Sequence, residues 1–196
     1  MTTTLIGRRV VLRPLVVEDF PAWQEVRRRN ADWLLKWEPL RAAGAPDPVE
    51  SRDAFAVRCG ARQRERQLGT GFGYGIFVGG HFAGEINLSI VQRGPFQSSY
   101  LGYWIDEKLA GQGYMPEAVV CVCRAAFEDI NLHRVQISII PRNTASRRVV
   151  EKLEIRNEGL AERYLEINGV WEDHVRYAIT AEEWEQRRDD ISAAWF

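Results

Sequence analysis

The sequence predicts an α+β fold, with a mixed, largely antiparallel central sheet flanked by helices. Two turn signals predict the antiparallel part: Gly79-Gly80 and Asn168-Gly169 each separate two stretches of strand-forming residues, as in a β-hairpin. A third observation adds helices to the sheet. The aromatic strand Tyr100–Ile105 is followed by a glycine-bearing loop and then by apolar residues at helical spacing from Met115 to Phe127.

The other elements follow from local start and stop signals. The expected elements, in chain order, are a strand at 9–14, helices at 19–29 and 47–68, strands at 72–78, 81–91 and 98–105, a helix at 115–127, a strand at 134–140, a helix at 144–153, strands at 158–167 and 170–179, and a helix from Thr180. Asp19 can cap the first helix, with Pro21 in its first turn. Asp47-Pro48 gives the same signal for the second, and Gly69 can end it. Thr180 and Glu183 form a capping box.

Composition limits the class of protein. With 196 residues, the chain is expected to form one domain, residues 189–196 being a short C-terminal tail. A net charge of −1 gives no electrostatic reason to expect a nucleic-acid or membrane partner. Three cysteines suggest neither a disulfide framework nor a metal site, and no apolar run is long enough for a membrane span. We therefore expect a soluble, cytoplasmic protein without a metal.

The run Lys108-Leu-Ala-Gly-Gln-Gly-Tyr-Met115 predicts an anion site. Free backbone N–H groups and the positive end of a helix dipole coincide where a strand turns into a helix. Gly111 and Gly113 let the main chain approach a phosphate, because they have no Cβ. The run is neither a P-loop nor a dinucleotide fingerprint, so we expect the pyrophosphate of another cofactor. The alternative is an ordinary strand-to-helix turn.

Three segments in this order resemble the GCN5-related N-acetyltransferase (GNAT) superfamily. The glycine loop resembles its Gln/Arg-x-x-Gly-x-Gly/Ala motif, with Lys108 in the Gln/Arg place, and Pro141-Arg-Asn-Thr-Ala-Ser146 resembles its Asn-x-x-Ser segment. The stretch from Tyr164 to Val175 is similar to that of the ribosomal-protein-alanine N-acetyltransferases. The resemblance covers the chain up to Trp184 and implies the GNAT fold. It departs at Leu153-Glu-Ile155, where the family usually has a helix-ending glycine, and at 32–48.

The resemblance implies acetyl transfer from acetyl-CoA to an amine by direct attack on the thioester, with coenzyme A as product. Loop N–H groups would hold the pyrophosphate, the main chain of β-strand residues 103–105 would pair with the pantetheine arm, and the Asn143 amide would hold that arm. Ser146 would lie near the leaving sulfur; its alternative role is to cap a helix. The cofactor-binding residues expected in this way are Tyr103, Trp104, Ile105, Lys108, Ala110, Gly111, Gln112, Gly113, Tyr114, Met115, Asn143 and Ser146.

The acceptor side is less determined. A protein α-amine, with a pKa of roughly 7.7–8.0, is partly neutral at pH 7, so a carboxylate acting through water could be base enough. Glu85 and Glu166 are candidates, the alternative being solvated strand residues. Trp33 and Trp37 could line an acceptor cleft or form a helical core pair. His174 follows Asp173 in a strand, so the two side chains point to opposite faces and cannot form a dyad.

Together these observations predict an acetyltransferase acting on the N-terminal α-amine of a protein, with ribosomal proteins as the expected acceptors. One alternative is acetylation of a small-molecule amine such as an antibiotic or polyamine. Another is an acyl-CoA-binding sensor without turnover. Acceptor identity, acyl-chain length (acetyl or succinyl) and oligomeric state stay open at this point.

Overall fold

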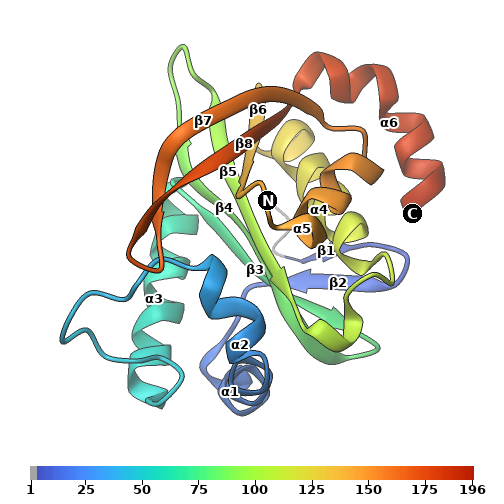
Figure 1. Cartoon of the computed structure of the whole chain (residues 1–196). Coiled ribbons are helices and arrows are strands. Elements are labelled where there is room, and N and C mark those ends of the chain that lie inside the picture. Colours follow the sequence, from blue (N-terminus) through green and yellow to red (C-terminus); the bar gives the residue numbers. More distant parts are fainter. Residues whose placement is uncertain (1–3) are drawn as a thin grey trace.

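The computed structural model describes residues 4–196. Its strands form one eight-stranded sheet in the order β1-β2-β3-β4-β5-β6-β8-β7 (Figure 1). The strands are β1 (Leu5–Ile6), β2 (Val10–Arg13), β3 (Phe72–Val78), β4 (His81–Gln92), β5 (Ser98–Ile105), β6 (Arg134–Ile139), β7 (Arg156–Ile167) and β8 (Val170–Thr180). All neighbouring strands pair antiparallel except β5 and β6, which pair parallel. The mixed, mostly antiparallel sheet is thus confirmed.

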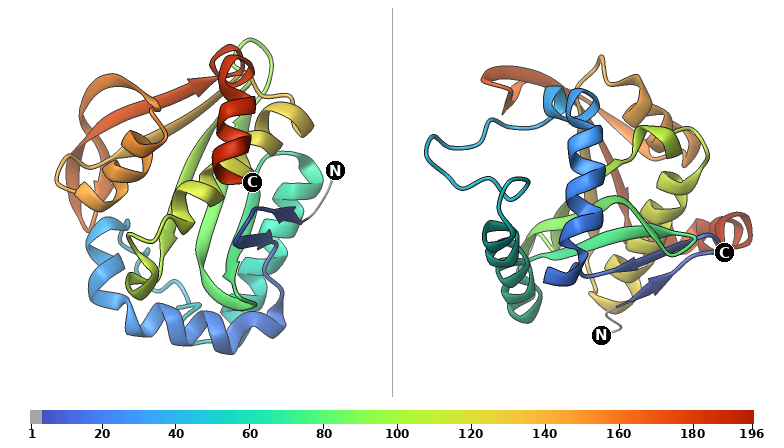
Figure 2. Two further views of the ribbon diagram at one scale, coloured as in Figure 1. Left: turned by 90° about the vertical axis from the view of Figure 1, so that its right-hand side faces the viewer. Right: turned by 90° about the horizontal axis from the view of Figure 1, so that it is seen from below.

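Helices cover both faces of the sheet (Figure 2). They are α1 (Phe20–Arg29), α2 (Ala31–Leu34), α3 (Arg52–Leu68), α4 (Tyr114–Arg124), α5 (Thr144–Lys152) and α6 (Ala181–Trp195), with short 3₁₀ turns η1 (Val17–Asp19), η2 (Leu35–Trp37) and η3 (Glu107–Leu109). One core joins α4, α5 and α6 to the sheet, and a smaller one joins α1 and α3 to its other face. No helix of the described chain is long and apolar enough to cross a membrane.

The expected start of the second long helix is wrong. Asp47 accepts a hydrogen bond from the backbone N–H of Val49 (2.8 Å), which forms a turn, and the chain is extended at Ser51. The Ser51 hydroxyl then accepts from Ala54 N (3.2 Å), so α3 begins at Arg52. Both positions carry a good cap residue, and only the backbone at Ser51 decides between them.

Asp19 also plays a different part from the one expected. Its carboxylate does not cap α1 but accepts from Arg13 (2.7 and 2.8 Å) and from Val16 N (2.9 Å). These bonds tie the start of the helical region to β2. The Arg13 guanidinium and the Val16 N–H hold the pKa of Asp19 below its usual value, although its burial acts in the opposite direction.

At the C-terminal side, the capping box of Thr180 and Glu183 is confirmed. The expected tail at 189–196 is wrong, because α6 continues to Trp195 and Ile191 is buried against the core. The missing glycine after α5 is replaced by Glu154, which adopts a left-handed backbone (φ +50°). Ile155 N then donates to Val150 O (2.9 Å) and ends the helix as the glycine would.

Two features of the middle of the chain shape the site. The helix expected over 115–127 ends as α4 at Arg124 and continues as a wider π-helical segment η4 (Ala125–Asp129). Strands β5 and β6 pair only through Ser98–Tyr100 and Arg134–Gln136, and then separate. Beyond Tyr100 the β6-facing edge of β5 is therefore unpaired, which opens a cleft in the sheet.

Candidate functional site

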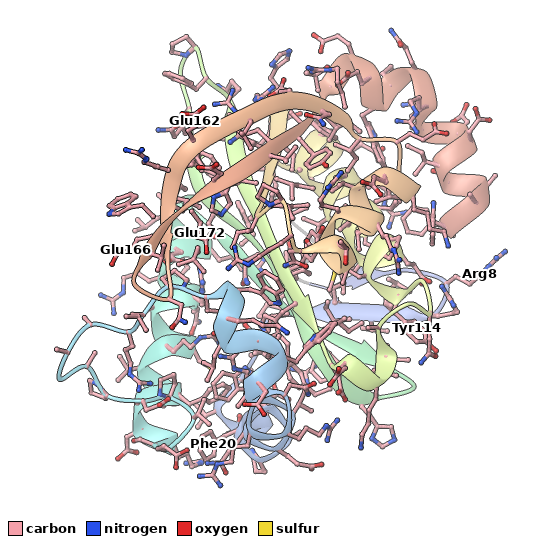
Figure 3. All side chains as sticks on the ribbon, in the orientation of Figure 1. Arg8, Phe20, Tyr114, Glu162, Glu166 and Glu172 are labelled. Carbon is pink, nitrogen blue, oxygen red and sulfur yellow. The ribbon has the colours of Figure 1, made fainter. Side chains whose placement is uncertain are left out.

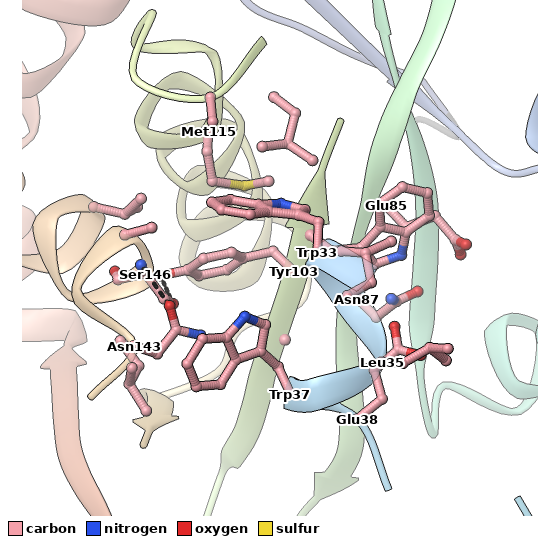
Figure 4. Close-up of a pocket in the computed structure, with 18 of the residues that line it drawn as sticks. Trp33, Leu35, Trp37, Glu38, Glu85, Asn87, Tyr103, Met115, Asn143 and Ser146 are labelled. Carbon is pink, nitrogen blue, oxygen red and sulfur yellow. Dashed lines mark hydrogen bonds between the residues drawn. The ribbon is translucent and has the colours of Figure 1, made fainter. Parts of the chain in front are cut away.

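A cavity of about 1330 Å³ lies where β5 and β6 separate. Its walls come from α1, α3, β4, β5, β6, β8, the start of α4, α5 and the segment from α2 to residue 49 (Figure 4). Most of the residues expected to act, although far apart in sequence, line this one cavity: Trp33, Trp37, Glu85, Tyr103, Trp104, Ile105, Ala110, Gly111, Gly113, Met115, Asn143 and Ser146.

The glycine loop has the geometry of an anion site. Gly111 (φ +77°) and Gly113 (φ +87°) have left-handed backbones that other residues rarely adopt, and Gly113 is the N-cap of α4. Within residues 4–196, no group accepts from the backbone N–H groups at positions 111–115. Ala110, expected to contribute as well, instead donates to Glu107 O (3.1 Å). The free N–H groups and the helix dipole leave a positive site at the cleft wall.

Three of the expected loop residues do not line the cavity. The side-chain amide of Gln112 donates to the backbone carbonyl oxygen of Lys108 (2.8 Å), and this bond closes the loop on itself. The ring of Tyr114 lies under the guanidinium of Arg9, 4.8 Å from its centroid. The side chains of Gln112 and Tyr114 therefore contact the loop and Arg9 rather than face the cavity.

A buried carboxylate, passed over at the sequence level, anchors this loop to the edge of the sheet. Glu117, 1% exposed, accepts from the backbone N–H groups of Arg9 and Val10 and from Arg9 Nε (3.0 Å). Arg9 Nη1 in turn donates to Gln112 O (3.1 Å). The signal available in the sequence was an acid in the first turn of an otherwise apolar helix.

On the other wall, Asn143 and Ser146 form one unit with β5. Asn143 Oδ1 accepts from Ser146 N (3.1 Å) and so caps α5 (Figure 4). Ser146 Oγ donates to the hydroxyl oxygen of Tyr103 (3.1 Å), whose own proton goes to Ser146 O (3.2 Å). Burial raises the pKa of Tyr103 far above its usual range, so the phenol stays protonated.

The two tryptophans do not form a helical core pair. Trp33 from α2 and Trp37 from η2 are half-buried and project into the cavity on either side of the Tyr103 ring (Figure 4). Behind them, Asn168 N at the β7–β8 turn donates to Glu38 O (2.9 Å). This contact joins the segment after η2 to the hairpin and bounds one end of the cavity.

The two candidate carboxylates lie in different places. Glu85 is buried, not solvated: its oxygens accept from Trp23 Nε1 (2.7 Å) and Arg58 Nη2. Glu166 is exposed on β7 and does not line the cavity. Figure 3 shows it on the hairpin, far across the molecule from the glycine loop at Tyr114.

A family model described as "Acetyltransferase (GNAT) domain" matches residues 9–156, about three quarters of the chain. The chain belongs to the GNAT acetyltransferase family. It is 33% identical over 177 residues to Probable N-acetyltransferase YjcK of Bacillus subtilis, covering 89% of this chain and 96% of the relative. The ribosomal protein uS5-alanine N-acetyltransferase of Escherichia coli is 33% identical over 180 residues, 90% of either chain.

A solved GNAT structure supports the same assignment. Mycobacterium smegmatis RimJ in complex with CoA-disulfide matches with a TM-score of 0.89 and 31% identity, over 97% of this chain and 93% of that chain. The chain is thus an N-acetyltransferase that uses acetyl-CoA. Its own residues fit this donor, because the loop offers unpaired N–H groups to a pyrophosphate and β5 offers an unpaired edge to an extended arm.

Proposed function

We propose that this GNAT enzyme acetylates the N-terminal α-amine of a protein in the cytoplasm, with ribosomal proteins as the acceptor class. The observation that carries the proposal is the 33% identity to ribosomal protein uS5-alanine N-acetyltransferase over 90% of both chains. At that level of similarity the acceptor can differ while the fold and donor are shared. The second line of support is the charge and the aromatic lining of the acceptor end, the part of the cavity lined by Trp23, Trp33, Trp37, Glu38, Asp47 and Glu85.

The charges at the acceptor end disfavour a polycationic acceptor. Each carboxylate among the described residues that line this end is paired with an arginine: Glu38 with Arg27, Asp47 with Arg41 and Glu85 with Arg58. An aminoglycoside or polyamine, with several ammonium groups, needs unpaired carboxylates. Aromatic rings from Trp23, Trp33, Trp37 and Trp104 dominate instead, and they suit an extended chain that carries a single amine.

In the proposed reaction the glycine loop, β5 and the start of α5 contact different parts of acetyl-CoA. When bound, acetyl-CoA supplies the acetyl group as a thioester, which the acceptor amine attacks directly. The loop at 111–115 binds the pyrophosphate, and the free edge of Tyr103, Trp104 and Ile105 orients the arm together with Asn143. Ser146 can turn its hydroxyl from Tyr103 toward the sulfur, where negative charge develops.

Ser146→Ala is expected to lower kcat by about 10- to 100-fold while the KM for acetyl-CoA stays within about twofold, because the contact strengthens as the thiolate forms. Steady-state kinetics with varied acetyl-CoA measure both constants. Ser138→Ala is the matched control, since Ser138 lines the same cavity on β6. An unchanged kcat in Ser146→Ala would leave this serine only its place in the first turn of α5.

The acceptor itself is tested with one peptide that has a free N-terminus, beginning with Ala or Ser, and an internal lysine. We expect acetyl on the α-amine, at a rate that rises from pH 7 to 8.5, because more of the α-amine is neutral there and the lysine stays protonated. Mass spectrometry locates the added group. Acetyl on the lysine, or on an aminoglycoside or polyamine alone, would contradict the proposal. Tight binding of acetyl-CoA without transfer to any amine would indicate a sensor.

A further inference from the structure

His174 on β8 lines the same cavity as the β4 carboxylate Glu85. Val175 on β8 pairs with Ile139 on β6, so His174 lies beside the chain just after β6, which leads to Asn143. It is 3% exposed and lines the cavity. The sequence argument excluded a dyad with Asp173, but it did not show which way the imidazole faces.

A hydrogen bond fixes the tautomer of this imidazole. His174 Nδ1 lies 2.9 Å from the backbone carbonyl oxygen of Glu172. A carbonyl can only accept, so Nδ1 carries a proton, and in the neutral ring Nε2 has the free lone pair. The bond therefore leaves Nε2 as the basic atom.

Nε2 is open to the cavity. Within residues 4–196 no group forms a hydrogen bond with it. In that part of the chain two side-chain atoms are both without a partner and fully enclosed by protein, Arg27 Nε and Asn87 Oδ1, and His174 Nε2 is not one of them. Since His174 Nε2 is unpaired but not enclosed, it keeps contact with open space, and the space that His174 lines is the cavity.

The groups around His174 place it at the acceptor end. The ring of Tyr164 on β7 stands edge-on to it, with centroids 5.7 Å apart. Glu172 shares its face of β8, and that carboxylate is paired with Arg142 (2.7 Å), whose guanidinium lies 5.4 Å from the Trp37 ring. Asp173 points to the opposite face and accepts from Arg163 N (2.8 Å). The carboxylate on the same face of β8 as the imidazole is thus already paired with an arginine.

Resting on the proposed function, we infer that His174 is the general base toward the acceptor amine. As the acceptor nitrogen bonds to the acetyl carbon, the carbon–sulfur bond breaks and its electron pair leaves with the sulfur. His174 Nε2 takes the proton that the nitrogen gives up. Nδ1 keeps its own proton, which stays hydrogen-bonded to the backbone carbonyl oxygen of Glu172. Glu85 is less suited, because Trp23 and Arg58 already engage both of its oxygens.

His174→Asn tests the role, because the Asn amide can replace the Nδ1 donor but provides no base. We expect kcat to fall by about 100- to 10,000-fold, with the acetyl-CoA thermal shift retained, and the lower-pH step of the kcat profile to disappear. The chain has only three histidines, so His81→Asn and His133→Asn are matched controls that should keep wild-type kcat. Glu85→Gln should keep the lower-pH step of the kcat profile.

A second readout needs neither turnover nor a folded variant. In the wild type, the NMR signals of the three imidazoles are followed as coenzyme A and acceptor peptide are added together. The His174 signal should shift, and those of His81 and His133 should not. An unmoved His174 signal, a wild-type profile in His174→Asn, or loss of the step in Glu85→Gln would each overturn the inference. If the wild type acetylates another amine instead of the peptide, the proposed acceptor fails, and the same variants are judged with that amine.

Discussion

Gly113→Val is expected to abolish acetyl-CoA binding. The native backbone at this position has φ +87°, which a β-branched residue does not tolerate, and the added Cβ would lie 3.1 Å from Arg9 Nη2. The loop must then rearrange, and the N–H groups that we propose for the pyrophosphate lose their alignment. Acetyl-CoA at 100 times its Kd should stabilise the wild type by about 2.7 kcal/mol, and this gain should vanish in the variant.

Gly60→Ala is the control for this experiment. Gly60 lies inside α3, and a Cβ built on it meets no atom within 4 Å. The variant should keep the full acetyl-CoA shift and gain about 0.5–1 kcal/mol of unfolding free energy, because alanine favours helix. A wild-type acetyl-CoA shift in Gly113→Val would show that the pyrophosphate binds elsewhere.

Glu117→Ala is expected to give the largest loss of stability, about 2–5 kcal/mol, because two backbone N–H donors lose their acceptor. The carboxylate is 1% exposed and serves two backbone N–H groups, those of Arg9 and Val10, as well as the Arg9 guanidinium. Its removal leaves these donors without their acceptor at the edge of the sheet. Urea denaturation at pH 7 measures the loss as a shift in midpoint.

Two further variants separate the contributions. Glu117→Gln keeps one acceptor oxygen and removes the charge, so its loss should be smaller than that of the alanine variant. Glu162→Ala removes an exposed carboxylate on β7 (Figure 3) and should change the unfolding free energy by less than about 0.5 kcal/mol. A loss below about 1 kcal/mol in Glu117→Ala would mean that water replaces the carboxylate at this edge.

The hairpins and the glycine loop were predicted correctly because their signals are local. Asn168-Gly169 is a turn signal by residue type alone, and Gly111 and Gly113 have the left-handed backbones that glycine adopts most readily. The helix start at Asp47 was wrong because two cap residues lie four positions apart, and the choice depends on how the intervening turn folds. The supposed tail at 189–196 was wrong because burial of Ile191 extends α6.

The sequence by itself determined the family, the glycine loop before α4 and the order of the elements, since each is carried by short motifs. Only the tertiary structure decided which side chains meet. Glu85 and Trp23 are 62 positions apart and Arg9 and Gln112 are 103 apart, so no local pattern predicts either contact. His174 shows the same limit: strand alternation assigns its face, but only the packing of β8 beside the end of β6 leaves Nε2 open to the cleft.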